Sequence, residues 1–161
     1  MQIISVMEKN EIKNVFVSHY HEDEQHIEKL KSLLGDSYKL RNYSVTSEKF
    51  NDAHNDDYIK SLLRPLISHA GTFICLIGEH THESDWVDWE IRQAEKQGKS
   101  IIGIYLNGER DAQLPAALEE LADSIVGWNG NSIESAINGS CHFEKFDGSP
   151  RSSVTIHRGE C

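Results

Sequence analysis

Residues 72–106 read TFICLIGEHTHESDWVDWEIRQAEKQGKSIIGIYL. Two apolar runs, 72–77 and 100–106, flank a segment with helical periodicity that ends at Gly98. A near-continuous apolar run of this length is typical of a strand that is covered on both faces. A strand, a helix and a second strand in this order predict two parallel strands joined by the helix. This unit therefore indicates an α/β fold.

The helix of this unit carries a carboxyl group on its apolar face. At about 100° per residue, the side chains of Trp86, Val87, Ile91 and Ala94 fall within an arc of about 140°. Glu90 lies inside this arc, at about 40° from Trp86. A carboxyl group in that position must be protonated, paired or lining a cavity. We expect either a buried Glu90 hydrogen-bonded to a neighbouring loop or a carboxyl group aimed into a cleft, with a pKa suited to chemistry.

The rest of the chain continues the alternation of strands and helices. Further strands are predicted at 14–18, 38–45 and 124–127, and further helices at 24–34, 58–67, 116–121 and 132–137. Pro65 predicts a kink or an early end in the second of these helices. Five alternating strands predict a flavodoxin-like three-layer sandwich, with a five-stranded parallel sheet in the order 2-1-3-4-5. We expect one domain over 1–140 and a flexible tail over 141–161, which lacks any period.

The composition narrows the class of protein. A chain of 161 residues with 26% charged residues is large enough for one core without staples. No apolar run approaches the length of a membrane span, and the N-terminus lacks a secretion pattern. The net charge of -10 argues against nucleic acid and anionic membranes as partners. Cys75, Cys141 and Cys161 lack metal-ligand spacing, and Cys75 falls in an apolar strand, so we expect reduced thiols and a cytoplasmic location.

Polar clusters follow the first and third strands, at 18–21 and 78–82. Ligands of open α/β sheets bind beyond the carboxyl ends of the strands, where the strand order reverses. In the predicted order this point lies between strands one and three. The helix that carries Glu90 begins just after the second cluster, and the long polar loop that contains Phe50 leaves the neighbouring second strand. We therefore expect one site where these four features meet.

Three kinds of chemistry can be compared with this site. Residues 19–24, HYHEDE, resemble the HxHxDH box of metallo-β-lactamase-type hydrolases, but Glu24 replaces the last histidine ligand. His80 and His82 could complete such a metal site. A phospho-acceptor receiver domain needs an aspartate after strand three, where the chain has glycine and glutamate at 78–79. Glycine-loop nucleotide motifs are absent from the sequence.

Glycosidic cleavage is the third kind of chemistry. A carboxylate beside aromatic side chains can stabilise an oxocarbenium-like transition state while a good leaving group departs. Glu90 can supply the charge, and Phe16, Tyr20, Phe50 and Trp86 can supply the aromatic walls. An aromatic side chain at such positions can equally belong to the core.

Three segments together resemble a known family. They are Val15–Ser18 followed by Asp23, the loop 50–53, and the helix 86–90, which is followed by a strand of the form seen at 98–104. Over residues 12–138 the chain resembles bacterial TIR-like domains, formerly grouped as a domain of unknown function. This group includes the TIR protein of Thoeris antiphage defence.

The resemblance implies NAD as a substrate, without a cofactor or a metal. In enzymatic TIR domains the residue that matches Glu90 is catalytic and breaks the nicotinamide–ribose bond. The residues that match Ser18, His19 and Tyr20, and the loop residues Phe50, Asn51 and Asp52, help to hold the dinucleotide. Phe16 and Trp86 complete the expected binding set.

The resemblance also implies partners. As an NADase or ADP-ribosyl cyclase of Thoeris type, the protein would make a cyclic or conjugated ADP-ribose signal that activates a separate effector. TIR sites are often completed by a neighbouring subunit, which implies a homo-oligomer, and activity can require a phage-derived trigger. The alternative from another class is a non-catalytic TIR adaptor, because one fold serves both roles. A buried Glu90 favours the enzyme, since an adaptor would more simply place an apolar residue there.

Overall fold

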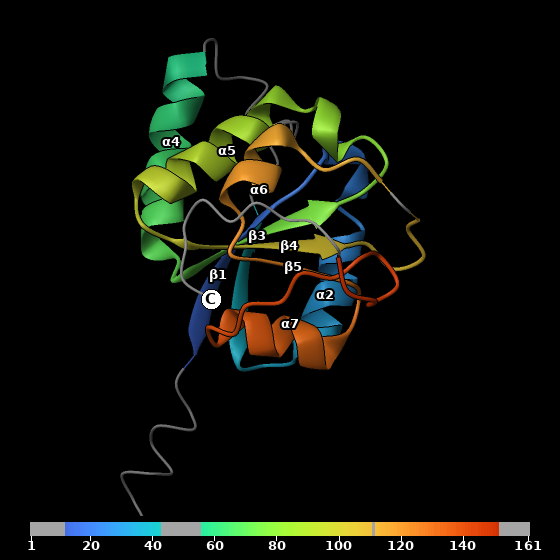
Figure 1. Ribbon diagram of the computed structural model, residues 1–161. Helices are drawn as coiled ribbons and strands as arrows, with labels where there is room; N and C mark the ends of the chain where they lie inside the picture. Colours follow the sequence, from blue (N-terminus) through green and yellow to red (C-terminus); the bar gives the residue numbers. More distant parts are fainter. Residues whose placement is uncertain (1–11, 43–55, 111, 152–161) are drawn as a thin grey trace, which may run out of the picture.

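The computed structural model describes residues 12–42, 56–110 and 112–151 of the chain. Five parallel strands form one sheet in the order β2-β1-β3-β4-β5, with helices on both faces (Figure 1). The predicted flavodoxin-like three-layer sandwich and its strand order are thereby confirmed. The strands are β1 (Lys13–Ser18), β2 (Tyr38–Asn42), β3 (Thr72–Ile77), β4 (Ser100–Tyr105) and β5 (Ser124–Val126).

Each face of the sheet has its own hydrophobic core. Helices α4 (Asp56–His69), α5 (Asp85–Lys96) and α6 (Ala116–Leu121) cover one face, and α2 (His26–Leu34) and α7 (Gly130–Ile137) cover the other (Figure 1). Successive side chains of a strand point to opposite faces. In β3, residues 73, 75 and 77 therefore enter the first core and residues 74 and 76 enter the second. This explains why the strand reads as a continuous apolar run.

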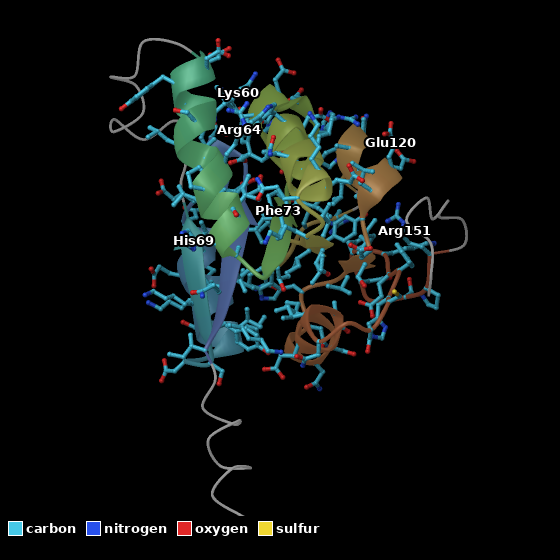
Figure 2. The ribbon with its side chains drawn as sticks, turned by 90° about the vertical axis from the view of Figure 1, so that its left-hand side faces the viewer. Lys60, Arg64, His69, Phe73, Glu120 and Arg151 are labelled. Carbon is cyan, nitrogen blue, oxygen red and sulfur yellow. The ribbon has the colours of Figure 1, made fainter. Side chains whose placement is uncertain are left out.

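Helix α5 has the boundaries that the sequence indicates. The Ser84 hydroxyl accepts a hydrogen bond from the Val87 N–H at 3.2 Å and caps the first turn. Gly98, just after the helix, has a φ of 71°, a conformation that glycine adopts without strain. Lys60 and Arg64 of α4 each lie 5.6 Å from the Trp89 ring and join the two helices by cation–π contacts (Figure 2).

Helix α4 does not end at Pro65. It continues through the proline to His69, so the expectation of an early end is wrong. Proline removes one backbone hydrogen bond, but it leaves the flanking turns free to pack. Leu63 and Ile67, on either side of Pro65, are fully buried in the core. Their burial outweighs the loss of one bond on the exposed side of the helix.

The segment 141–151 packs against the end of the sheet. The Ile125 N–H donates to the carbonyl of His142 at 2.8 Å, and the Glu144 N–H donates to the carbonyl of Ile125 at 2.7 Å. The Arg151 guanidinium donates to the Tyr105 hydroxyl at 2.7 Å. This portion therefore differs from the flexible tail expected from residue 141, because backbone pairing holds it. The domain boundary at residue 140 stays a prediction, and residues 152–161 lie outside the described part.

The cysteines differ from the expectation of reduced thiols throughout. Cys75 of β3 is a buried free thiol, whereas Cys141 is disulfide-bonded. Among the described residues, no helix is both long enough and apolar enough to cross a membrane.

Candidate functional site

Glu90 of α5 meets Ser18 at the carboxyl end of β1. The Ser18 hydroxyl donates a hydrogen bond to Oε1 of Glu90 at 2.7 Å. Both side chains are buried, and Glu90 is only 3% exposed. The predicted burial of Glu90 and its proximity to the exit of the first strand are therefore observed.

The second carboxyl oxygen of Glu90 has a different environment from the first. Oε2 is buried and has no hydrogen-bond partner within the described residues. An unsatisfied buried acceptor costs free energy unless a proton, a water or a ligand satisfies it. Burial raises the pKa of Glu90 from 4.5 to about 8, and the hydrogen bond from Ser18 partly opposes this rise. Glu90 is therefore largely protonated at neutral pH, and a nearby cation would favour its ionised form.

The residues after β1 lie beside the residues after β3, as the sequence predicts. The Tyr20 ring is 4.2 Å from the His21 ring and 5.8 Å from the His80 ring, measured between centroids. His19 is buried, and burial, together with the nearby His21, lowers its pKa to about 4. His19 is therefore neutral at physiological pH. Thr81 accepts from the Gly78 N–H at 2.8 Å and fixes the turn after β3.

Two of the expected aromatic residues belong largely to the core. Phe16 has no exposed surface and stacks on Phe73, with ring centroids 5.5 Å apart. In this structure Phe16 lies in the core and offers no surface to a ligand, which differs from its expected role in binding. Trp86 is half-buried and packs against the same core, with its ring 6.0 Å from that of Trp89. The other expected binding residues, Phe50, Asn51 and Asp52, lie outside the described residues.

Asp23 is a second carboxyl group at this edge of the sheet, and it is not among the site residues expected from the sequence. Its Oδ2 atom is buried and lacks a hydrogen-bond partner in the described ranges, and burial raises its pKa. A Cβ atom added to Gly78 would lie 2.6 Å from this oxygen, so the glycine leaves room for the carboxyl group. In the sequence, the short distance of Asp23 from the end of the first strand is the feature that could have indicated its place in the site.

The metal-hydrolase alternative can be compared with the described residues. Within the part of the chain that the structure describes, no three His, Cys, Asp or Glu side chains are grouped so that they could hold a metal ion. His80 instead bonds to Glu83 at 2.8 Å, within the turn that precedes α5.

Residues 16–111 match the family model described as Thoeris protein ThsB, TIR-like domain. The match spans more than half of the chain. The chain belongs to this family of TIR-like domains. The TIR-like fold and the kind of protein, a TIR-like domain of antiphage defence, are thereby established. The matched range contains both Ser18 and Glu90 of the candidate site.

A solved structure shares the fold of this TIR-like domain. It is a 2-deoxyribosyltransferase from the psychrotolerant bacterium Bacillus psychrosaccharolyticus, with a TM-score of 0.55 and 14% sequence identity. The alignment covers 75% of this chain and 90% of the transferase. At this identity the similarity concerns the fold alone. No curated protein matches the chain.

Proposed function

We propose that this TIR-like domain cleaves the nicotinamide–ribose bond of NAD, with Glu90 as the catalytic residue. The observation that carries the proposal is the buried carboxyl group of Glu90, which has one oxygen bonded to Ser18 and the other available within the described residues. A buried acceptor at the carboxyl edge of an α/β sheet is suited to bind a ribose hydroxyl. The resemblance of the site residues to those of enzymatic TIR domains supports NAD as the substrate.

The raised pKa of Glu90 fits a cationic substrate. In the free protein the carboxyl group is largely protonated because it is buried. The positive charge of the nicotinamide ring favours the ionised form, so substrate binding and loss of the proton are coupled. The carboxylate then stabilises positive charge that develops at the anomeric carbon as the bond breaks.

The proton and electron balance needs no acid at the leaving group. The electron pair of the breaking bond goes to the ring nitrogen, so nicotinamide leaves as a neutral molecule. An acceptor then attacks the anomeric carbon and loses a proton. With water the product is ADP-ribose, and with the adenine ring or another small molecule it is a cyclic or conjugated nucleotide. We propose such a nucleotide as the signal that activates a separate effector protein.

The 2-deoxyribosyltransferase of similar fold is consistent with cleavage of a bond to a sugar. Its name states that it transfers a deoxyribosyl group, so the fold accommodates reactions at a sugar carbon in at least one other protein. Because fold alone does not fix function, the proposal depends on Glu90 and not on this likeness.

The test is mass spectrometry of nucleotides from cells that express the chain, with and without phage challenge. We expect NAD to be consumed and an ADP-ribose-derived species to appear with the parent chain. Glu90→Gln keeps the size of the side chain and an acceptor for Ser18, and it should lower turnover about 100-fold or more. Glu95→Gln, the same change on the same helix outside its buried face, is the matched control and should leave turnover intact.

Two outcomes would contradict the proposed enzymatic activity. Full turnover by Glu90→Gln would remove this residue from the mechanism. Intact NAD in every condition, with folded protein in the cells, would favour the non-catalytic adaptor. The exposed Tyr58 and Leu62 on α4 would then be the first surface to examine for a protein partner.

A further inference from the structure

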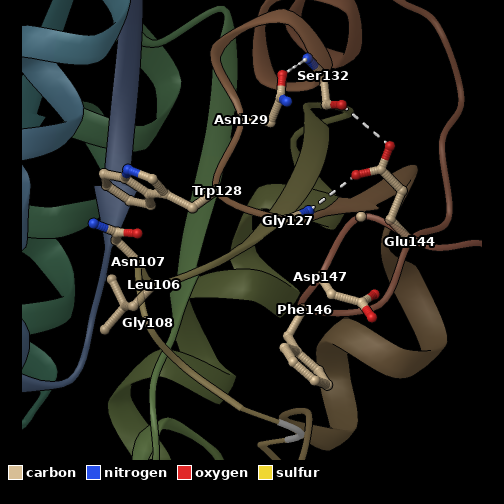
Figure 3. Close-up of a pocket in the computed structure, with 11 residues that line it drawn as sticks. Leu106, Asn107, Gly108, Gly127, Trp128, Asn129, Ser132, Glu144, Phe146 and Asp147 are labelled. Atoms are coloured by element: carbon tan, nitrogen blue, oxygen red, sulfur yellow. Dashed lines mark hydrogen bonds between the residues drawn. The ribbon is translucent and has the colours of Figure 1, made fainter.

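A cavity of about 360 Å³ lies at the carboxyl ends of β4 and β5. Eleven residues line it, and Glu90 is not one of them (Figure 3). They come from the turns after β4 and β5, the start of α7 and the segment 141–151. The volume falls within the range of small-molecule sites. Ligands of α/β sheets bind at this edge, so the cavity is a second candidate site on the same molecule.

The walls of the cavity combine aromatic and polar side chains. Trp128 and Asn107 lie on one side, and Phe146, Asp147 and Glu144 lie on the other (Figure 3). Trp128 and Phe146 are half-buried and pack against different cores of the sheet, which holds each ring in place. Rigid aromatic walls of this kind suit a compact ligand with an apolar part, and their ring faces attract cations.

Both charged residues in the lining are acidic. Hydrogen bonds from the side chain and the backbone of Ser149 hold the pKa of Asp147 below its ordinary value, so this carboxylate is ionised at neutral pH. Glu144 is held by two donors, the Gly127 N–H and the Ser132 hydroxyl, each at 3.1 Å. None of the eleven lining residues is Lys, Arg or His. The cavity therefore disfavours an anionic ligand.

The start of α7 does not reverse this preference. A free helix N-terminus attracts anions through its unbonded N–H groups. Here the Asn129 side chain already accepts hydrogen bonds from the N–H groups of Asn131 and Ser132, at 2.9 and 3.2 Å. The donors of the first turn thus face a capping side chain, and the two carboxyl groups determine the charge preference of the cavity.

The cavity is held by close backbone packing. A Cβ atom at Gly127 would lie 3.0 Å from the carbonyl oxygen of Phe146, so the glycine lets the turn 145–148 approach β5. Gly148 closes this turn with a φ of 85°. The aromatic ring and the carboxylate that this turn carries are therefore positioned by the fold before any ligand arrives.

We propose that this cavity binds a small organic cation, an alkylguanidinium or alkylammonium group, with its charge toward Glu144 and Asp147 and its apolar part against Trp128 and Phe146. The side-chain oxygen of Asn107 provides a further acceptor for the N–H groups of such a cation. The proposal does not depend on the cleavage of NAD, because the cavity and Glu90 share no residue.

The test is an NMR titration of the full chain with butylguanidinium and with its neutral isostere, butylurea. We expect saturable shifts of the indole N–H of Trp128 and of the backbone amides of Gly108, Gly127 and Gly148. A dissociation constant of about 1 mM is expected for so small a ligand. Butylurea should bind at least about tenfold more weakly, since it lacks the charge.

Variants distinguish binding of the cation in this cavity from non-specific binding to an acidic protein. Asp147→Asn keeps an acceptor for Ser149 and should weaken butylguanidinium binding about threefold, and Trp128→Leu should have a similar effect. Glu119→Gln, on the exposed side of α6, should have none. Equal binding of butylurea, shifts confined to other residues, or no saturable shift would each overturn the proposal.

A capped arginine tripeptide in the same titration identifies the source of the cation. Tighter binding of the peptide than of butylguanidinium would indicate a side chain of a protein partner. Weaker binding would indicate a free small molecule. Either result supports the shared chemistry, and failure of both probes contradicts it.

Discussion

Two regions of the carboxyl edge of the sheet hold acidic side chains in opposite states. Beside β1 and β3, in the middle of the sheet, Glu90 is buried, and burial raises its pKa to about 8. At the β4 and β5 end, Asp147 is exposed, and hydrogen bonds from Ser149 lower its pKa. Burial disfavours the charged form of a carboxyl group, and donated hydrogen bonds favour it. One fold thus presents a neutral acid in the middle of this edge and a negative charge beside β4 and β5.

The largest expected difference between the two regions is the loss of stability when a phenylalanine of each is replaced by alanine. Phe16→Ala should lower the free energy of unfolding by about 3 to 5 kcal/mol, because the ring is fully buried and stacked on Phe73. Phe146→Ala should cost about 1 to 2 kcal/mol, because that ring is only half-buried. Urea denaturation of both variants measures this. Equal losses of unfolding free energy in the two variants would mean that the two regions are equally well packed.

Glu90 should give the stability a pH dependence that Glu90→Gln lacks, whereas His19, whose pKa burial lowers to about 4, contributes the opposite slope in both chains. A pKa that is raised on folding means that the folded chain binds more protons than the unfolded chain between pH 4.5 and about 8. The contribution of Glu90 to the free energy of unfolding should therefore fall as pH rises through this window, by up to about 1.4 kcal/mol per pH unit. Between pH 5.5 and 7.5, Glu90→Gln should gain about 2 to 3 kcal/mol relative to the parent chain.

Denaturation curves at the two pH values check this, with Glu95→Gln as the matched control. The control should follow the parent chain. A constant difference between the parent and Glu90→Gln at both pH values would show that Glu90 ionises as an exposed glutamate does.

Substitution of two glycines, each just after a strand, compares how tightly the two regions are packed. A methyl group at Gly127 would meet backbone atoms, at 3.0 Å from Phe146 and 3.2 Å from Gly148. Gly127→Ala should therefore destabilise the protein by about 1 to 3 kcal/mol. A methyl group at Gly78 meets the side-chain ends of Asp23 and Leu106, which can rotate, so Gly78→Ala should cost about 1 kcal/mol or less. Thermal denaturation ranks the two variants, and the reverse ranking would contradict the rigid turn beside β5.

The last comparison concerns the two hydroxyl groups that bond to carboxyl groups, and it includes the smallest expected effect, that of Ser149→Ala. Ser18→Ala removes the donor to buried Glu90 and should cost about 1 to 2 kcal/mol and raise the pKa of Glu90 further. Ser149→Ala should leave stability within experimental error, because Asp147 is exposed to water, but it should raise the pKa of Asp147 toward its ordinary value. Carboxyl ¹³C NMR titration measures both pKa values. A lower pKa for Glu90 in Ser18→Ala would contradict the assigned bond.

The features that follow a local period could be predicted from the sequence. The burial of Glu90 follows from its angle on α5, and the strand order follows from alternating strands and helices, because both depend on neighbours in the chain. The path of α4 through Pro65 could not be predicted, since it depends on how deeply Leu63 and Ile67 pack. The role of Phe16 was ambiguous for a related reason, because an aromatic residue in a strand suits a core as well as a ligand.

No periodic pattern in the sequence predicts the cavity beside β4 and β5. Its residues come from separate turns and from a segment whose pairing uses backbone groups, which any sequence carries. The disulfide bond of Cys141 likewise depends on tertiary position and not on spacing.

The backbone pairing of residues 142–144 with β5 has a consequence for assembly. A strand at the border of a sheet presents unpaired N–H and C=O groups to which a strand of another molecule can add. The N–H and C=O of Ile125 are both occupied by the chain itself. In the described part of the chain, β2 pairs with β1 alone, so its other side is the border at which a foreign strand could add. Strand addition between copies through this border would therefore join β2 to β2 and stop at two copies, because the β5 side is already occupied.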